Sequence, residues 1–310
     1  MLTFVLRESA YFGTNRTGNT HPAPSLIMKT STTNIGTFID LRRNWAFKTI
    51  FGTTGNEDLL LALVQAILPD KNITGVTLIP TEKMGVREDS RSAVFDISCE
   101  TSSGDFISVE MQFSEQDDFG DRMMFYSSFP IFNSLSRGGT SYAFKAPVYI
   151  IGILNFILPG VVPNDRLINQ YRMLNTQDAR AELSGNLTCL TLELPKFSKT
   201  LKNLETLADK LFYTLAHISE MKERPDSFSE IILEKLFERC SFASMTYEQQ
   251  YAYIRSIMAE VDERSRLRTA VNKALAEDRA EVARALREKG ISPSVIAEAC
   301  GITENEIRNL

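Results

Sequence analysis

Two acidic residues lie inside the stretch FDISCETSSGDFISVEMQ, which runs from Phe95 to Gln112 and otherwise favours β-structure. Acidic residues such as Asp96 and Glu110 are disfavoured within strands, so their presence there needs a reason. One interpretation places both carboxylates on a solvated face of a hairpin. The other is that they hold a divalent cation, because hard cations prefer carboxylate oxygens.

The alternation of side chains in this stretch predicts two strands of a sheet with one buried side. The predicted apolar face carries Ala93, Phe95, Ile97, Cys99, Ile107, Val109, Met111 and Phe113. The predicted polar face carries Asp96, Ser98, Glu100, Ser108, Glu110 and Gln112. The two acidic residues therefore share a face.

The pairing register of the two strands depends on the turn between them. Residues 102–104 predict a three-residue loop in which Gly104 takes the left-handed conformation. Counting outward from this loop, Asp96 lies across from Glu110 with their Cβ atoms about 5 Å apart. A two-residue loop would put the two carboxylates on opposite faces. Under the three-residue register, facing like charges destabilise the hairpin unless a cation or a proton intervenes.

A divalent ion between Asp96 and Glu110 would resolve this conflict. Mg²⁺ is usually bound by one or two carboxylates together with waters and a substrate phosphate. The carbonyl of Met111 offers a third oxygen, and Gln112 is placed to orient a water. An ion held in this way polarises a phosphoryl oxygen and makes bound water easier to deprotonate, which is the chemistry of phosphodiester hydrolysis.

The composition is that of an ordinary globular protein, with 310 residues of which 43% are hydrophobic and 24% charged. Such a length suits one large domain or two moderate ones. No apolar run reaches the roughly 18 residues of a membrane-spanning helix, and the only apolar patch at the start is short and ends before Arg7. We therefore expect a cytoplasmic protein that does not engage a membrane.

Cysteine, histidine and net charge narrow the chemistry further. The four cysteines lie far apart without a CxxC pair, which argues against a zinc knuckle or a disulfide framework and predicts reduced, mostly buried thiols. The two histidines, His21 and His217, are too few for a His-rich metal site, and His217 falls in an amphipathic helical pattern where a structural role is expected. The net charge of −5 means that DNA binding would require a local basic surface.

The elements that must position the acidic pair can be predicted from apolar spacing. Residues 1–36 are polar and turn-rich and are expected to form a poorly ordered leader. Helices are predicted around Trp45–Phe51, over 56–68 before Pro69, and over 119–135, where Pro130 should kink the helix or end its first half. Strands are predicted at 76–82, in the hairpin, at 146–158 with both faces buried, and at 187–197.

The rest of the chain has the apolar spacing of helices, over 200–221, 226–240, 246–261 and 262–289. In the last of these, a narrow apolar stripe comprises Leu267, Val271, Leu275, Val282 and Leu286. Such a stripe packs on its own domain or, less often, forms a homodimer. The predicted division is a leader at 1–36, a domain at 37–198, a helical region at 199–289 and a tail at 290–310.

The tail has a helix-turn-helix rhythm. Ser292 can cap a first helix, and Thr303 can cap a second one with Glu306 at the capping-box position. The residues expected to close a small core are Ile296, Ala299, Ile302 and Ile307. A bare αα-hairpin or an oligomerising element is favoured over a DNA reader, because the second helix is short and carries two acidic residues.

Six stretches in order give the sequence a family resemblance. They are DLRRNWAFKTIFG (40–52), NEDLLLALVQAIL (56–68), FDISCETSSGDFISVEMQ (95–112), DRMMFYSSFPIFNSLSRGGTSY (121–142), PVYIIGILNF (147–156) and LTLELPKF (190–197). The chain resembles the PD-(D/E)XK nuclease superfamily and, within it, the bacterial recombination-promoting nucleases that are also labelled transposases. The resemblance implies an α/β fold, with a mixed sheet flanked by helices and an all-helical C-terminal region, and the activity of a metal-dependent DNA endonuclease.

The resemblance also implies roles for individual residues. Asp96 and Glu110 become metal ligands and catalytic residues, and Gln112 takes the position of a lysine in the wider superfamily. Glu57 is a candidate for a further ligand, with a solvated acid in the first turn of a helix as its alternative. The expected ion is Mg²⁺, with Mn²⁺ or Ca²⁺ as alternatives. A catalytically inactive relative that binds DNA or protein is the competing function.

Contacts to DNA are expected from basic and aromatic side chains. Lys48 and Arg122 match family positions, and Arg122 lies one helical turn from Tyr126, so that the two can flank a cleft together. Further candidates are Arg42 and Arg43. The loop RGGTSY at 137–142 either approaches a phosphate or simply connects two elements.

Overall fold

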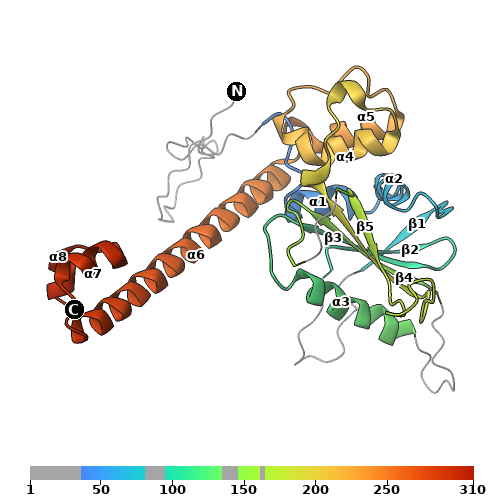
Figure 1. Cartoon of the computed structure of the whole chain (residues 1–310). Coiled ribbons are helices and arrows are strands. Elements are labelled where there is room, and N and C mark those ends of the chain that lie inside the picture. The colour runs from blue at the N-terminus through green and yellow to red at the C-terminus, as the bar shows by residue number, and fades with distance from the viewer. Residues whose placement is uncertain (1–35, 81–94, 135–145, 161–164) are drawn as a thin grey trace, which may run out of the picture. The chain divides into compact units, whose positions relative to one another are not determined.

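The computed structural model describes residues 36–80, 95–134, 146–160 and 165–310 (Figure 1). These residues form two compact units, and the division falls between Thr246 and Tyr247. Among the described residues, every helix is too short or too polar to cross a bilayer. The predicted four-part division of the chain stays a prediction.

The first unit is built on a six-stranded mixed sheet with the strand order β1-β2-β3-β4-β6-β5. Its strands are β1 (Val76–Ile79), β2 (Ile97–Thr101), β3 (Phe106–Gln112), β4 (Val148–Leu154), β5 (Ile168–Tyr171) and β6 (Leu187–Glu193). The pairs β3–β4 and β4–β6 are parallel, and the other pairs are antiparallel. The short strand β5 was not predicted from the sequence.

Helices cover both faces of this sheet (Figure 1). They are α1 (Asn44–Phe51), α2 (Glu57–Ile67), α3 (Phe119–Ser134), α4 (Leu207–His217) and α5 (Ile231–Cys240). Helix α3 lies on one face, and α2, α4 and α5 lie towards the other. The predicted fold class, a mixed sheet flanked by helices, is confirmed.

The central strands are buried on both faces, as their continuous apolar sequence predicts. All seven residues of β4 and all seven of β6 are buried. Gly152 of β4 faces α3, and a Cβ atom there would lie only 2.7 Å from the ring of Phe119. Glycine therefore permits α3 to pack close to the sheet, beside the strand that carries Glu110.

The predicted hairpin register is confirmed. Ile97 pairs with Val109 and Cys99 pairs with Ile107, and the same register brings Asp96 opposite Glu110. The loop closes through a hydrogen bond from the Thr101 amide to the Asp105 carbonyl at 2.9 Å. Gly104 has φ = 88°, the left-handed conformation that glycine adopts without strain.

The expectation of one wet face for this hairpin is wrong. Ser98, Ser108 and Glu110 are at most 1% exposed, and Asp96 is also buried. Phe95 is a further correction, because it packs on Tyr126 and Phe129 of α3 instead of sharing the face of Ile97 and Cys99. The reason is that β2 begins only at Ile97 and that aromatic side chains of α3 cover the polar face.

The predicted helix over 119–135 is confirmed as α3, which continues through Pro130, so the alternative in which Pro130 ends its first half is wrong. Another helix differs from its predicted extent. In the second unit, α6 (Tyr247–Glu288) is one helix of 42 residues where two segments were predicted. The charged residues between those segments favour a helix as well as their neighbours do, and no glycine or proline interrupts them.

The tail forms α7 (Pro293–Cys300) and α8 (Glu304–Arg308), joined at Gly301. The capping box of Thr303 and Glu306 is confirmed, whereas the side chain of Ser292 makes no capping hydrogen bond. Ala299 is exposed and not part of the core as predicted. The prediction is confirmed for Ile296 and Ile307, which are buried, and for Ile302, which packs against them partly buried, while Ala283 and Cys300 complete the core.

Candidate active site

Asp96 and Glu110 hold each other through backbone hydrogen bonds. The amide of Asp96 donates to Oε1 of Glu110 at 2.9 Å, and the amide of Met111 donates to Oδ2 of Asp96 at 3.0 Å. Each carboxylate is therefore anchored by the opposite strand of the hairpin. This reciprocity exists because the three-residue loop sets the register.

The pair is electrostatically frustrated. Burial raises the pKa of Glu110 to about 8, and the neighbouring charge of Asp96 adds to the effect. Burial also raises the pKa of Asp96, although hydrogen bonds from Met111 and Asn44 oppose it. Two neighbouring buried carboxylates are both ionised only at a high cost in free energy unless a positive charge is bound beside them.

Positive side chains approach the pair from two helices. From α3, Arg122 donates to Oε2 of Glu110 at 3.1 Å and to the side chain of Gln116 at 2.9 Å. The guanidinium also lies over the ring of Tyr126, 5.2 Å from its centroid. From α1, Nζ of Lys48 lies 3.9 Å from Oδ1 of Asp96. The structure thus brings Lys48, Arg122 and Tyr126 together at the acidic pair.

Asn44 is a member of this site that the sequence interpretation missed. Its side-chain amide donates to Oδ1 of Asp96 at 2.5 Å, the same oxygen that Lys48 approaches. Asn44 precedes Lys48 by four residues on α1, so the two share a helix face. That spacing is the signal in the sequence that could have identified it.

The remaining predicted residues lie differently. The amide of Gln112 donates to the Ser114 carbonyl at 3.2 Å, and Glu57 accepts a hydrogen bond from the backbone of Gly55 at 2.7 Å. Neither contact is with the acidic pair. The loop at 137–142 lies outside the described residues.

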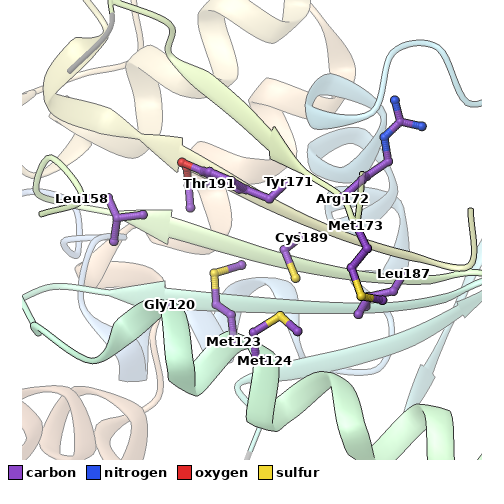
Figure 2. Close-up of a pocket in the computed structure, with 10 residues that line it drawn as sticks. All are labelled: Gly120, Met123, Met124, Leu158, Tyr171, Arg172, Met173, Leu187, Cys189 and Thr191. Carbon is purple, nitrogen blue, oxygen red and sulfur yellow. The ribbon is translucent and has the colours of Figure 1, made fainter. Parts of the chain in front are cut away.

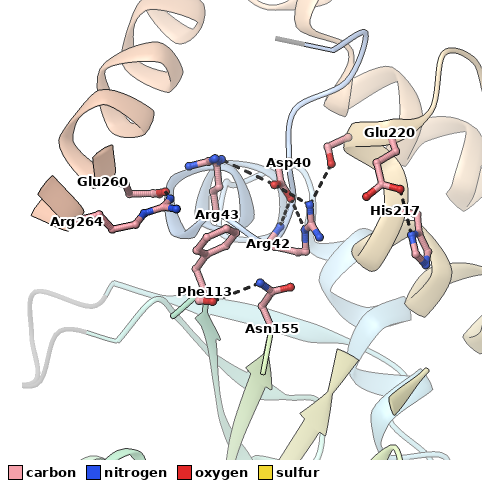
Figure 3. Close-up of polar contacts among 10 residues, drawn as sticks. Asp40, Arg42, Arg43, Phe113, Asn155, His217, Glu220, Glu260 and Arg264 are labelled. Carbon is pink, nitrogen blue, oxygen red and sulfur yellow. Dashed lines mark hydrogen bonds and ion pairs between the residues drawn. The ribbon is translucent and has the colours of Figure 1, made fainter. Parts of the chain in front are cut away.

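Arg42 and Arg43 contact Asp40 near the start of α1 (Figure 3). Arg42 forms two hydrogen bonds with the Asp40 carboxylate, at 2.9 and 3.1 Å, and a third with the Ser219 hydroxyl at 3.3 Å. Nε of Arg43 lies 3.8 Å from Oδ2 of Asp40, and the Arg43 guanidinium lies over the ring of Phe113. At the end of α4, Nδ1 of His217 lies 3.6 Å from Oε2 of Glu220.

The donor set suits a hard divalent cation. Asp96 and Glu110 offer facing carboxylates, and among the described residues no group of three or more His, Cys, Asp or Glu side chains forms a metal cluster. Within the part of the chain that the structure describes, the four cysteines are free and buried, and none takes part in such a group. Two carboxylates with water and phosphate to complete the shell are what Mg²⁺ uses.

A cavity of about 320 Å³ lies between α3 and strands β5 and β6 (Figure 2). Its lining is mostly apolar and includes Met123, Met124, Tyr171 and Cys189. Neither acidic residue of the pair lines it. The cavity is therefore separate from the site of the predicted chemistry.

The mixed six-stranded sheet with flanking helices is consistent with the fold of PD-(D/E)XK nucleases. A model of the PD-(D/E)XK nuclease family transposases matches residues 41–270. The chain belongs to this family, which supports nuclease activity on DNA. No curated protein and no solved structure matches the chain.

Proposed function

We propose that this protein is a metal-dependent DNA endonuclease that hydrolyses phosphodiester bonds during recombination or the movement of mobile elements. The observation that carries the proposal is the buried, facing pair of Asp96 and Glu110, held in place by reciprocal backbone hydrogen bonds. Two buried, facing carboxylates destabilise a hairpin, and a bound cation would remove the repulsion between them.

Each residue of the site has a role in this proposal. Asp96 and Glu110 bind Mg²⁺, with Mn²⁺ or Ca²⁺ as substitutes, and the bound ion would polarise the scissile phosphate and activate water. Asn44 holds the Asp96 carboxylate in one orientation. Arg122 and Lys48 place positive charge beside the acidic pair, where a DNA phosphate would lie, and Tyr126 packs against Arg122 to hold it there.

The competing candidate is a catalytically inactive relative that binds DNA or protein. One contact favours it: Arg122 already pairs with Glu110 at 3.1 Å, so a side-chain cation occupies part of the space where a metal would act. In such a protein the ion pair would keep the acids as structural residues.

Incubation of supercoiled plasmid with the protein and Mg²⁺ tests the proposal. We expect nicked or linear DNA from the wild type and none from Asp96→Ala, with Asp178→Ala as the control because Asp178 is exposed. Equal cleavage by wild type and Asp96→Ala would refute the site. Binding without cleavage by either protein would favour the inactive relative, and a joined-strand product would indicate transposition.

We further propose that two copies associate through residues 262–289. Leu267, Val271 and Leu275 lie along α6 and are between 48% and 56% exposed. Three arginines lie around the first of these residues, Arg264, Arg266 and Arg268, and three acids follow the last of them, Glu277, Asp278 and Glu281. An antiparallel pair of α6 helices would join opposite charges and cover the stripe.

Analytical ultracentrifugation of Val271→Glu and Leu275→Glu tests this association. We expect the wild type to be a dimer and each variant a monomer, because a buried unpaired acid opposes the contact. Ile231→Glu is the control, since Ile231 is an exposed apolar residue of α5. A wild-type monomer would refute the dimer. The cytoplasmic location stays a prediction from the sequence.

A further inference from the structure

Phosphodiester hydrolysis at the acidic pair requires a positive charge that can contact the scissile phosphate. Hydrolysis of a phosphodiester bond adds water to phosphorus and breaks the bond to the leaving oxygen, which then takes up a proton. Negative charge increases around the phosphate as the transition state forms, and a preorganised positive charge nearby lowers the activation barrier of the reaction. This inference rests on the proposed nuclease function and asks which side chain supplies that charge.

Two residues near the pair are poorly suited to this task. Gln112 is neutral, and its amide is engaged with the Ser114 carbonyl. Arg122 is charged, but it is already bound to Glu110 and Gln116, and it packs on the ring of Tyr126. Moving Arg122 onto a phosphate would break contacts that hold it in a half-buried position.

Lys48 has the position and the freedom that these two residues lack. Its ammonium lies 3.9 Å from Oδ1 of Asp96, which makes an ion pair but is too long for a hydrogen bond. The short hydrogen bond to that oxygen comes from Asn44 instead. The Lys48 side chain is 38% exposed, so DNA can reach the ammonium from solvent.

Helix α1 fixes this placement. Ala46, Phe47, Ile50 and Phe51 are buried, which anchors the helix and turns Asn44 and Lys48 towards the acidic pair. A lysine ammonium is a compact charge with three donors on a flexible stem, so it can follow a phosphate as its geometry changes. The lysine therefore combines a fixed backbone with a mobile charged end.

We propose that Lys48 is a catalytic residue whose ammonium neutralises the charge that develops on the scissile phosphate, a task that the neutral Gln112 does not perform. The contribution of Lys48 is electrostatic. Its function differs from that of a lysine that merely attracts the DNA backbone, which would strengthen binding without changing the rate of the bound complex.

Cleavage kinetics of Lys48→Gln separate these two roles. We expect kcat to fall about 100-fold, as when one charge-stabilising donor is removed from an active site. We expect KM, and DNA affinity measured in EDTA, to stay close to wild type. Lys202→Gln, which removes an exposed lysine of the same unit, is the control, and the melting temperature in EDTA reports whether each variant folds.

A charge swap provides the second variant. Position 112 lies two residues beyond Glu110 on the same face of β3, so Lys48→Gln combined with Gln112→Lys returns an ammonium to the site. We expect the double variant to recover at least about tenfold in kcat over Lys48→Gln, since the stabilising charge is restored. A folded double variant as slow as Lys48→Gln would overturn the proposal that the ammonium charge itself is what Lys48 contributes.

The outcomes distinguish the two proposals. If the folded wild type does not cleave DNA, the nuclease function fails and the role of Lys48 fails with it. If the wild type and Lys48→Gln cleave equally fast, only the role of Lys48 fails. A loss of affinity, with the salt dependence of binding reduced by about one charge and kcat unchanged, would show an ordinary backbone contact and overturn the proposal.

Discussion

Two buried glutamates on one face of the sheet make very different contacts. Glu110 lies on β3 and Glu193 at the end of β6, two strands away on the same face, and both are at most 2% exposed. Glu193 accepts hydrogen bonds from the Leu158 amide at 3.0 Å and from Asn169 at 2.8 Å. It also pairs with Lys196 at 3.0 Å.

Glu110, in contrast, faces another acid. Its backbone donor comes from Asp96, the residue whose charge repels it, and Arg122 balances only one of the two carboxylates. A satisfied buried acid such as Glu193 serves the fold, whereas a frustrated pair persists where function requires it. The contrast teaches that burial alone does not identify the site, and that the balance of partners does.

The largest expected effect comes from Glu110→Gln. DNA cleavage should fall by at least about 10³-fold, because residues of one catalytic unit fail together. The free energy of unfolding in EDTA should change by less than about 1 kcal/mol. The amide oxygen still accepts from Asp96, and the relieved repulsion offsets the lost ion pair with Arg122, whose side chain is 28% exposed. Plasmid cleavage and urea denaturation measure the two quantities. A variant that cleaves normally but unfolds easily would make Glu110 a structural residue.

Glu193→Gln should show the opposite pattern. Stability should fall by about 3 kcal/mol, because the buried Lys196 loses its partner. The folded fraction should cleave DNA at the wild-type rate. Adding Lys196→Met should recover part of the lost stability by removing the unpaired charge. An unchanged urea midpoint in the single variant would contradict the structural role of this ion pair.

Mg²⁺ should raise the stability of the folded protein by binding at the Asp96–Glu110 pair and not at Glu193. When free Mg²⁺ exceeds its dissociation constant about 100-fold, binding adds about 2.7 kcal/mol to the stability of the folded protein. We expect a higher melting temperature in the wild type and in Glu193→Gln, and no rise in Glu110→Gln. An equal rise in all three proteins would place the ion elsewhere.

Stability should also depend on pH. The folded state raises the pKa of Glu110 from 4.5 to about 8, so the folded protein holds a proton that the unfolded chain releases. In EDTA, the free energy of unfolding should therefore be highest below pH 4.5 and should fall as the pH rises from 4.5 towards about 8. Urea denaturation across this range should show a shallower decline for Glu110→Gln.

Local patterns were sufficient for much of the fold. The loop at 102–104 predicted the register of β2 and β3, and the continuous apolar sequences of β4 and β6 predicted strands buried on both faces. Where the prediction failed, distant segments were responsible. Helix α3 covers the face that was expected to be wet, and Asn44 reaches Asp96 across 52 positions of the sequence.

The facing of Asp96 and Glu110 could be predicted from local sequence, because side-chain alternation and the turn act over neighbouring residues. The environment of the two carboxylates depends on tertiary contacts. Packing of α1 and α3 removes water from the pair, raises the pKa of both acids, and brings Lys48 and Arg122 beside them. Desolvation and long-range charge pairing depend on which segments meet in space, and no local pattern encodes that meeting.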